Sequence, residues 1–294
     1  MSNFEFDVLV VGSLHLDIVV KAKALPMLDE TAIGSSWAMV CGGKGGNQAC
    51  WAAKLGAKTA MISQVGADDF GHRLLDNLKA RGVNSKGVTT DPKTGSGMSV
   101  AILNADGDYG AVIVSGSNLT LNEDQLRKSM HSTGAPRWLV LQNEVEESIN
   151  IAAAKQAKAW SSRIILNAAP ARSMPLALAE MVDVLVVNRV EASMLSGHEV
   201  IGAETVAAAL PALRRFGRDV IVTLGGGGLV VAERGRDAIT IPAIRKSVVS
   251  THGAGDFFVA KLAVSLAQNA NLIEAANVAN QTAAAYVGGN LKSS

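Results

Sequence analysis

Short apolar runs alternate with amphipathic stretches over most of the 294-residue chain. Each run has four to six apolar positions without a polar residue at every second place, which is typical of strands buried on both faces of a parallel sheet. The segments between them carry apolar residues at helical spacing, and several end in glycine. Strands are expected at residues 7–12, 58–66, 137–142, 163–170, 183–188 and 219–226. Helices are expected at residues 46–56, 68–82, 146–160 and 204–217.

This alternation predicts an α/β fold with a doubly wound, mainly parallel sheet flanked by helices, in a single domain over residues 1–294. Two regions, about residues 17–38 and 98–114, instead alternate apolar and polar positions around a turn. We expect them to form a small antiparallel β lid, although an ordinary hairpin at the edge of the main sheet would show the same pattern. The chain after residue 253 is expected to be helical nearly to its end.

Charge and cysteine content exclude several classes of protein. Lysine plus arginine number 27 against 26 acidic residues, without a run of like charge, so neither nucleic acid nor a membrane surface is an expected partner. The five histidines and two cysteines lack the spacing of a metal site. Glu5 and Asp7 stand where a signal peptide would carry lysine, and the apolar run that follows is too short to span a membrane. We expect a soluble, cytoplasmic protein.

The stretch "CGGKGGNQACWAAKLG" places a glycine-rich loop around Lys44 directly before a helix. It is not a Walker A loop, because Ala38 stands where its first glycine would be and Gly45 replaces the Ser or Thr after the lysine. Glycine allows close backbone approach, and the N–H groups at a helix start face a ligand above them. The loop is expected to hold a polyhydroxyl ligand through backbone N–H, Lys44 and Asn47, with a tight turn as the alternative.

The first strand ends in "VVGSLHLD", which puts His15 and Asp17 beyond its carboxyl end, where ligands bind in open α/β sheets. A carboxylate that accepts two hydroxyl protons suits a vicinal diol, although Asp at a strand end is often a turn former. In "DVLVVNRVEASML", Asn188 and Glu191 fit either a helix capping box or a hydrated Mg²⁺ site. In "DVIVTLGGGGLVVA", a wide glycine turn after Thr223 suits a purine or a phosphate, or a simple hairpin.

The stretch "GAGD" opens the helical C-terminal region. Gly253, Ala254 and Gly255 offer successive N–H groups at a helix N-terminus, which form an anion hole for a phosphoryl group in transfer. Asp256 follows them and is placed to take a proton from an attacking hydroxyl. A carboxylate in the first helical turn also stabilises the helix by ~0.3–1 kcal/mol, which is the structural alternative.

Taken together, "GGKGGNQA" near the start and "GAGD" near the end resemble the two signatures of the ribokinase-like (PfkB-type) carbohydrate kinases. "LNAAPAR", "VNRVE" and "VTLGGGG" fall between them in the family's order, so the resemblance covers about residues 5–290. It implies ATP-dependent phosphorylation of the primary hydroxyl of a small sugar, D-ribose first, with Mg²⁺ and a homodimer formed through the lid. Another acceptor (a fructose-type ketose, deoxyribose or a nucleoside) and a catalytically weak sugar- or nucleotide-binding homologue are the alternatives.

The resemblance also implies roles for individual residues. The sugar-binding positions would be Ser13, His15, Asp17, Gly42, Gly43, Lys44, Asn47, Glu144 and Asp256. The ATP-binding positions would be Asn188, Thr223, Gly225, Gly228, Gly255 and Asn280, with Glu191 near Mg²⁺. Gly253, Ala254 and Gly255 would form the anion hole, and Asp256 would be the catalytic base.

Three features depart from the family pattern. His15 stands where the family has Asn, which leaves the sugar open. Ser250 stands where the family has an Asp of the monovalent-cation site, which leaves K⁺ activation open. The ending "GGNLKSS", where family members continue, agrees with a truncated chain.

Overall fold

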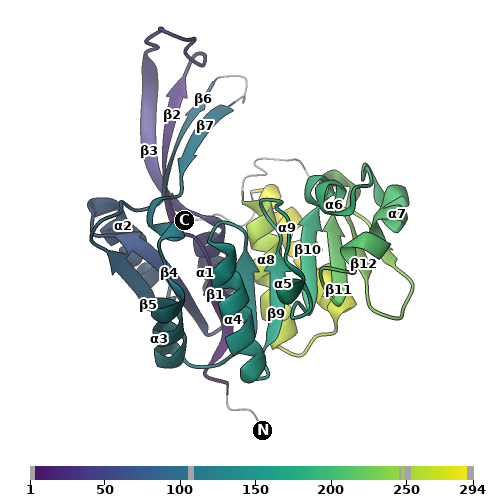
Figure 1. Ribbon diagram of the computed structural model, residues 1–294. Coiled ribbons are helices and arrows are strands. Elements are labelled where there is room, and N and C mark those ends of the chain that lie inside the picture. Colours follow the sequence, from purple (N-terminus) through teal and green to yellow (C-terminus); the bar gives the residue numbers. More distant parts are fainter. Residues whose placement is uncertain (1–3, 105–108, 245–246, 248–252, 290–294) are drawn as a thin grey trace.

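The computed structural model describes residues 4–104, 109–244, 247 and 253–289, which form a large main sheet with helices on both faces and a smaller sheet that projects from it (Figure 1). In the main sheet, seven neighbouring strands are parallel and the last two pairings are antiparallel. Its strands, in spatial order, are β5 (Asn84–Asp91), β4 (Thr59–Gly66), β1 (Phe6–Val11), β8 (Pro136–Gln142), β9 (Arg163–Asn167), β10 (Val184–Asn188), β11 (Asp219–Thr223), β12 (Leu229–Ala232) and β13 (Ile239–Ile241).

Two layers of helices cover the two faces of this sheet. The helices on one face are α1 (Lys44–Lys54), α2 (Asp69–Ala80), α8 (Ala254–Ala267) and α9 (Leu272–Val287). The helices on the other are α3 (Glu123–Thr133), α4 (Glu147–Ala159), α5 (Leu176–Ala179), α6 (Arg189–Ser196) and α7 (Ala203–Leu213). Strand β1 shows why both layers are needed, since Val8 and Val10 enter the first apolar cluster and Leu9 and Val11 enter the second.

The smaller sheet, here called the lid, contains β2 (His15–Ala22), β3 (Gly34–Gly42), β6 (Met98–Leu103) and β7 (Tyr109–Val114). Two antiparallel hairpins, β2–β3 and β6–β7, are joined by a parallel pairing of β2 with β6. The lid is therefore a separate sheet and not a hairpin at the edge of the main one, and its central pairing is parallel where antiparallel pairing was expected.

The order of the main sheet reverses between β1 and β8. From β1 the chain continues to β4 on one side, and it later returns to place β8 on the other side. Ligands in open α/β sheets bind beyond the carboxyl ends of the strands at such a switch point. The lid rises from this same place, because β2 follows β1 after three residues.

The predicted fold class is confirmed, and the six strands and four helices expected from the sequence are all present. Helices α3 and α5 and strands β5 and β13 were not expected. Strand β5 is an edge strand in which only Gly87 is fully buried, so it shows no apolar run. Helix α3 has strongly polar composition, and its signal is the capping box formed by Asn122 and Gln125. No helix in the described ranges is both long and apolar enough to cross a membrane.

Candidate active site

The switch point brings together three residues that the sequence singled out. Ser13 follows β1, Glu144 follows β8, and Lys44 begins α1. The Ser13 hydroxyl donates to Glu144 Oε2 at 2.5 Å, and the backbone N–H of Lys44 donates to the same oxygen at 2.9 Å. Glu144 therefore ties the end of β1 to the N-terminus of α1, where a carboxylate is favoured by the helix dipole.

The glycines of the loop before α1 are required by close packing. Gly43 has φ +83°, and a Cβ at Gly45 would lie 2.7 Å from the backbone nitrogen of Ser13. Both positions therefore exclude larger residues whatever binds nearby. The tight turn is therefore present, and it brings Lys44 and Asn47 to the switch point. A ligand-binding role for this loop stays a prediction.

Asp17 lies on β2 at the base of the lid. The Ser99 hydroxyl, from the neighbouring strand β6, donates to Asp17 Oδ1 at 2.5 Å. A Cβ at Gly42 would lie 2.3 Å from Asp17 Oδ2, so Gly42 leaves the space that this carboxylate fills. His15 is 5% exposed, and its Nε2 has no hydrogen-bond partner in the part of the chain that the structure describes.

Asp256 occupies the first turn of α8 and is 7% exposed. Its Oδ2 accepts from Asn47 Nδ2 at 2.9 Å, and its Oδ1 accepts from Gln48 Nε2 at 3.0 Å. Burial raises the pKa of the Asp256 carboxyl above its ordinary value, against the opposing effects of the Lys44 charge and of these two hydrogen bonds. A buried carboxylate with a raised pKa, held by two amide donors, is suited to accept a proton.

The backbone before Asp256 is shaped for open access. Gly253 is the N-cap residue of α8 and has φ +73°, a left-handed conformation that glycine adopts at low cost. Ala254 begins the helix. A Cβ on Gly255 would meet nothing within 4 Å among the described residues, so the side-chain direction of Gly255 is open.

Sequence reasoning missed a relay of amides behind Asp256. Gln142 Nε2, at the end of β8, donates to Gln48 Oε1 at 2.7 Å, and Gln48 in turn donates to Asp256. The carboxylate can only accept, so it fixes the orientation of both amides. Gln142 also explains Gly12, because a Cβ there would lie 1.8 Å from Gln142 Oε1. The position of Gln48 directly after Asn47 in the glycine-rich stretch was the signal available for it.

Replacing Gln48 by Met should raise the pKa of Asp256 further, because it removes a donor that stabilises the ionised carboxylate. As the predicted catalytic base, Asp256 would act in its ionised form, so the acid limb of the pH–rate profile should move to higher pH. We expect about a tenfold loss of kcat at pH 6 and a smaller loss at pH 9, which is the scale of one hydrogen bond to a charged group. An equal loss at both pH values would show that Gln48 acts through packing alone.

Two further residues position the site: Asn118, which carried no sequence signal, and Arg172, which ends the stretch "LNAAPAR". Asn118 accepts from the backbone N–H of Leu14 at 2.8 Å and donates to its carbonyl at 2.9 Å, which fixes the chain just before His15. Arg172 Nη1 donates to the carbonyl of Val145 at 2.8 Å, directly after Glu144. Both residues come from segments distant in sequence, so no local spacing reveals these contacts.

Two of the residues assigned to the nucleotide, Asn188 and Thr223, are the last residues of β10 and β11. Asn188 and Glu191 form the capping box of α6, with hydrogen bonds of 2.8 and 2.9 Å in the two directions. Glu191 is nevertheless 8% exposed, and burial raises the pKa of its carboxyl, as does the Asp256 charge, while Lys44 lowers it. Glu191 therefore caps a helix and is also close enough to Lys44 and Asp256 for their charges to act on its carboxyl. Thr223 is the register partner of Asn188 on the next strand.

The glycine turn between β11 and β12 has an open side and a packed side. A Cβ on Gly225 would meet nothing within 4 Å, whereas one on Gly228 would lie 2.2 Å from the carbonyl oxygen of Ile241. Asn280 of α9 donates to the neighbouring carbonyl of Pro242 at 2.9 Å. Gly228 and Asn280 thus border the same short segment, and Gly225 is free to approach a ligand.

Ser250, which stands where the family has an Asp of the monovalent-cation site, lies outside the described residues. Among the residues that are described, no group of three or more His, Cys, Asp or Glu side chains could hold a metal ion.

Comparison with known proteins identifies the family. The model of the pfkB family carbohydrate kinases matches residues 5–290. The chain belongs to the pfkB family of carbohydrate kinases. A ribokinase of Mus musculus is 33% identical over 268 residues, which cover 90% of this chain and 83% of that protein. A deoxyribokinase of Salmonella typhi is 32% identical over 255 residues, which cover 86% of this chain and 83% of that protein.

The structure of Arabidopsis thaliana ribokinase complexed with ribose and ATP is similar to this pfkB-family chain at a TM-score of 0.88. The match has 29% sequence identity and covers 98% of this chain and 93% of that one. The predicted family and the prediction of a carbohydrate kinase that uses ATP are confirmed. The roles of the individual site residues stay predictions.

Proposed function

We propose that this kinase transfers the γ-phosphoryl group of ATP to the primary hydroxyl of D-ribose, which yields ribose 5-phosphate and ADP. The observation that carries the proposal is the buried Asp256 carboxylate at the start of α8, hydrogen-bonded to the loop that would hold the sugar. Similarity to ribokinases over most of the chain supports ribose as the acceptor.

Asp256 would act as the general base. It would take the proton of the hydroxyl as that oxygen attacks the γ-phosphorus, and the bond from phosphorus to the ADP oxygen would break. Its raised pKa makes the ionised carboxylate a stronger base than an exposed aspartate. The N–H groups of Gly253, Ala254 and Gly255 would stabilise the charge of the phosphoryl group in transfer.

Asp17, Lys44 and Asn47 would hold the sugar hydroxyls, with Glu144 and Ser13 fixing the loop. Two hydroxyls can share one carboxylate, and Ser99 already satisfies one side of Asp17. The unpartnered Nε2 of buried His15 lies at the base of the lid, and a sugar hydroxyl bound there would give this nitrogen a hydrogen-bond partner.

The nucleotide would lie along Asn188, Thr223, Gly225, Gly228 and Asn280. Mg²⁺ would suit this site, since it usually binds through one or two carboxylates and the phosphates of the substrate, and the Glu191 carboxylate is close enough to Lys44 and Asp256 for their charges to act on it. The ion would supply positive charge to the phosphate oxygens.

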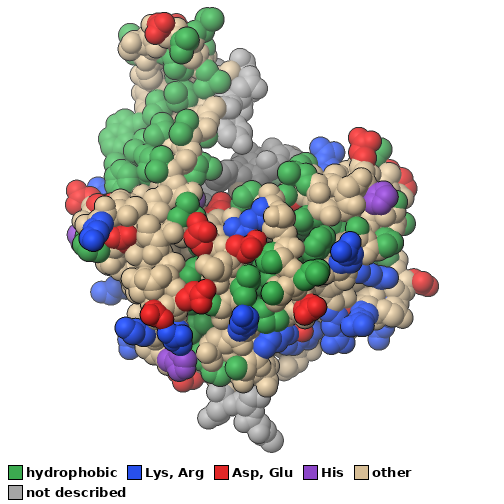
Figure 2. All heavy atoms as spheres, viewed as in Figure 1, with side chains coloured by type: hydrophobic (Ala, Val, Ile, Leu, Met, Phe, Trp, Pro, Cys, Tyr) green, Lys and Arg blue, Asp and Glu red, His purple; other side chains and the backbone are tan. Residues whose placement is uncertain are grey.

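The lid would close over the sugar and would also join two chains. Register places one continuous set of apolar side chains on the face opposite Asp17: Ile18, Val20, Trp37, Met39, Val100, Ile102, Val112 and Val114. Trp37 is 66% exposed and Val112 is 69% exposed, and Figure 2 shows hydrophobic side chains gathered on the lid. Such a patch is typical of a protein interface, and we propose a homodimer.

The free thiols of Cys41 and Cys50 agree with a reducing compartment such as the cytoplasm.

A charge on that exposed apolar face should separate the chains. We expect Trp37→Glu to be monomeric at micromolar concentration in light scattering after gel filtration, where the native chain is a dimer. Ser36→Glu is the matched control, because Ser36 lies on the other face of the same strand. A native chain that elutes as a monomer, or a dimer that survives Trp37→Glu, would contradict the proposed interface.

The acceptor is tested by ADP release from Mg-ATP with D-ribose, 2-deoxy-D-ribose, fructose, xylulose, adenosine and no acceptor, each in Na⁺ or K⁺. We expect the highest kcat/KM with D-ribose. 2-Deoxy-D-ribose is the second candidate because a deoxyribokinase is nearly as similar as the ribokinases. The ratio of rates in K⁺ and Na⁺ tests whether Ser250 has removed cation activation. Equal ADP release with and without every acceptor would overturn the proposal.

A further inference from the structure

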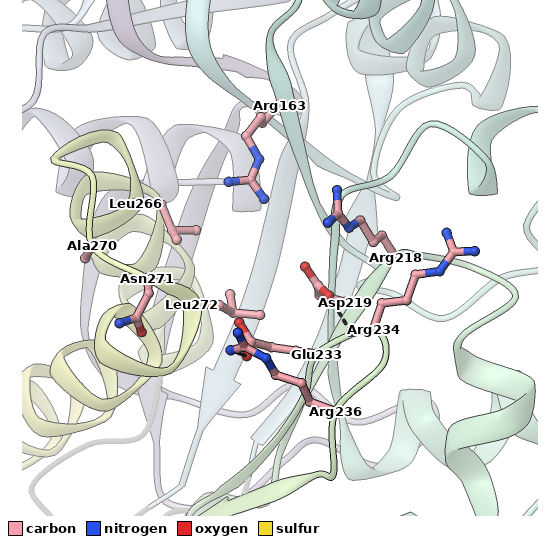
Figure 3. A pocket seen from close by; sticks show the side chains of 10 residues that line it. All are labelled: Arg163, Arg218, Asp219, Glu233, Arg234, Arg236, Leu266, Ala270, Asn271 and Leu272. Carbon is pink, nitrogen blue, oxygen red and sulfur yellow. Dashed lines mark hydrogen bonds and ion pairs between the residues drawn. The ribbon is translucent and has the colours of Figure 1, made fainter.

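A second group of charged residues lies at the opposite end of the main sheet from the candidate active site. Arg163 is the first residue of β9, Arg218 directly precedes β11, and Arg234 and Arg236 lie in the turn between β12 and β13. Because the active site is at the carboxyl ends of these parallel strands, the arginines occupy the far edge. With the turn that joins α8 to α9, they line a hollow of about 300 Å³ (Figure 3).

The hollow has an excess of positive charge, since four arginines and only two carboxylates line it. Arg163, Arg218 and Arg234 form no ion pair with any residue that the structure describes. Across the whole chain positive and negative charges nearly balance, so this concentration of unpaired guanidinium groups is local.

Both carboxylates of the hollow are already engaged. Glu233 pairs with Arg236 at 2.6 Å. Asp219 is 8% exposed and accepts the backbone N–H of Arg234 at 2.8 Å. Their remaining role is structural, because they hold the turn that carries two of the arginines against β11.

The Arg163 guanidinium is fixed by stacking in a position from which it could bind an anion. Its guanidinium lies 4.3 Å from the ring centroid of Trp138, which is 3% exposed and belongs to the neighbouring strand β8. Stacking on an aromatic face leaves the N–H edge of a guanidinium available for a planar pair of acceptors. Arg163 and Arg218 reach into the hollow from different strands, and Arg234 extends away from them (Figure 3).

We propose that this hollow binds a small phosphate monoester at a site distinct from the active site. A phosphate monoester carries about −1.5 to −2 charge near pH 7, which matches the excess of two positive charges. Arginine binds phosphate oxygens in bidentate pairs, so Arg163 and Arg218 would hold the phosphoryl group. Leu266 and Leu272 also line the hollow and would contact the carbon part of the ligand.

The same hollow is connected to the catalytic residues by one pair of helices. Helix α8 carries Asp256 at its start and Leu266 near its end, and α9 returns from the hollow to Asn280. Eleven of the residues in α8 are buried in a close-packed core, so a shift at the C-terminal end of the helix would be transmitted along it. A ligand against the α8–α9 turn would therefore change the affinity of the nucleotide site, and the nucleotide would change the affinity of the hollow equally.

The test is isothermal titration calorimetry on the full chain saturated with Mg²⁺, ribose and a non-hydrolysable ATP analogue. The titrants are ribose 5-phosphate, glycerol 3-phosphate, inorganic phosphate and inorganic sulfate. We expect one binding event with each ester, weakened at least tenfold in R163Q/R218Q and in R218Q alone, and unchanged in R127Q. R218Q guards against misfolding, because the Arg218 side chain makes no bond to the described residues, and R127Q removes an equal charge from α3.

The outcomes separate the possible ligands. Tighter binding of ribose 5-phosphate than of glycerol 3-phosphate identifies the sugar phosphate as the source, and equal binding supports phosphate monoesters in general. Binding of sulfate as tight as that of the esters, or binding unchanged in R163Q/R218Q, overturns the site. The affinity for the ATP analogue should change at least twofold when the ester is present, in the native chain but not in R163Q/R218Q, and no change overturns the coupling. If the ATP analogue itself does not bind, the proposed kinase reaction is in doubt and not the hollow. The titration of the ATP analogue shows this independently of the ester titrations.

Discussion

Asp256→Asn should lower kcat by ~10²–10⁴, the usual contribution of a general base, while ATP affinity stays within a fewfold. The amide cannot take the proton of the attacking hydroxyl, but it keeps the size and place of the carboxylate at the start of α8. Turnover is measured by ADP release in the presence of sugar, and ATP affinity by calorimetry. Retained turnover would remove Asp256 from the role assigned to it.

Stability gives this substitution a second readout. Burial raises the pKa of Asp256 in the folded chain, so the folded state binds this proton more tightly than the unfolded state and loses stability as pH rises through that window. Above that window the native protein holds an ionised buried carboxylate, and there the Tm of Asp256→Asn should be no lower than that of the native protein. The matched control is Asp69→Asn, because Asp69 is also in a first helical turn but is exposed. If Asp256 served only to stabilise the helix dipole, the two substitutions would change the Tm by the same amount.

Asp17→Asn should raise the KM for the sugar and lower kcat/KM by about a hundredfold, the scale expected for two charge-assisted hydrogen bonds to hydroxyls. Asparagine keeps the shape that fits above Gly42 but offers one acceptor oxygen, and its amino group would oppose a hydroxyl proton. The KM for ATP should be unchanged, because Asp17 lies at the base of the lid and not along the nucleotide residues. Steady-state kinetics with each substrate varied in turn measure both constants.

Ser99→Ala is the control that separates position from charge. Ser99 donates to Asp17 Oδ1, so its removal loosens the carboxylate without removing it, and we expect only a fewfold rise in the KM for the sugar. If Asp17→Asn raised the KM for ATP as strongly as that for the sugar, Asp17 would not belong to the sugar half of the site.

The sequence was sufficient for the main fold because buried parallel strands carry an unmistakable apolar run. Strand β1 and its neighbours are covered on both faces, so nearly every position in them is apolar. Strand β5 was not predicted, because it lies at the sheet edge and is largely polar. The parallel pairing of β2 with β6 could not be predicted, because it joins two hairpins about eighty residues apart and no local pattern encodes that register.

The site residues that the sequence predicted lie in local motifs, whereas those it missed reach the site through contacts between distant segments. Asp256 and Lys44 lie in glycine-rich stretches whose composition is unusual in itself, and the structure brings both to one place. Gln142, Ser99 and Asn118 are ordinary polar residues in sequence, and their contacts with the site arise only from the folding of distant elements together. The capping box at Asn188 shows the converse, since a purely local pattern correctly predicted hydrogen bonds while leaving the role of Glu191 open.

The most direct test of the central claim is ³¹P nuclear magnetic resonance of the native chain with Mg-ATP and D-ribose. Transfer to the primary hydroxyl predicts loss of the γ-phosphate signal and a new monoester signal split into a triplet by the two protons on C5. That triplet should be absent with Asp256→Asn over the same time. Release of inorganic phosphate alone, or a doublet from phosphorylation of a secondary hydroxyl, would contradict the account.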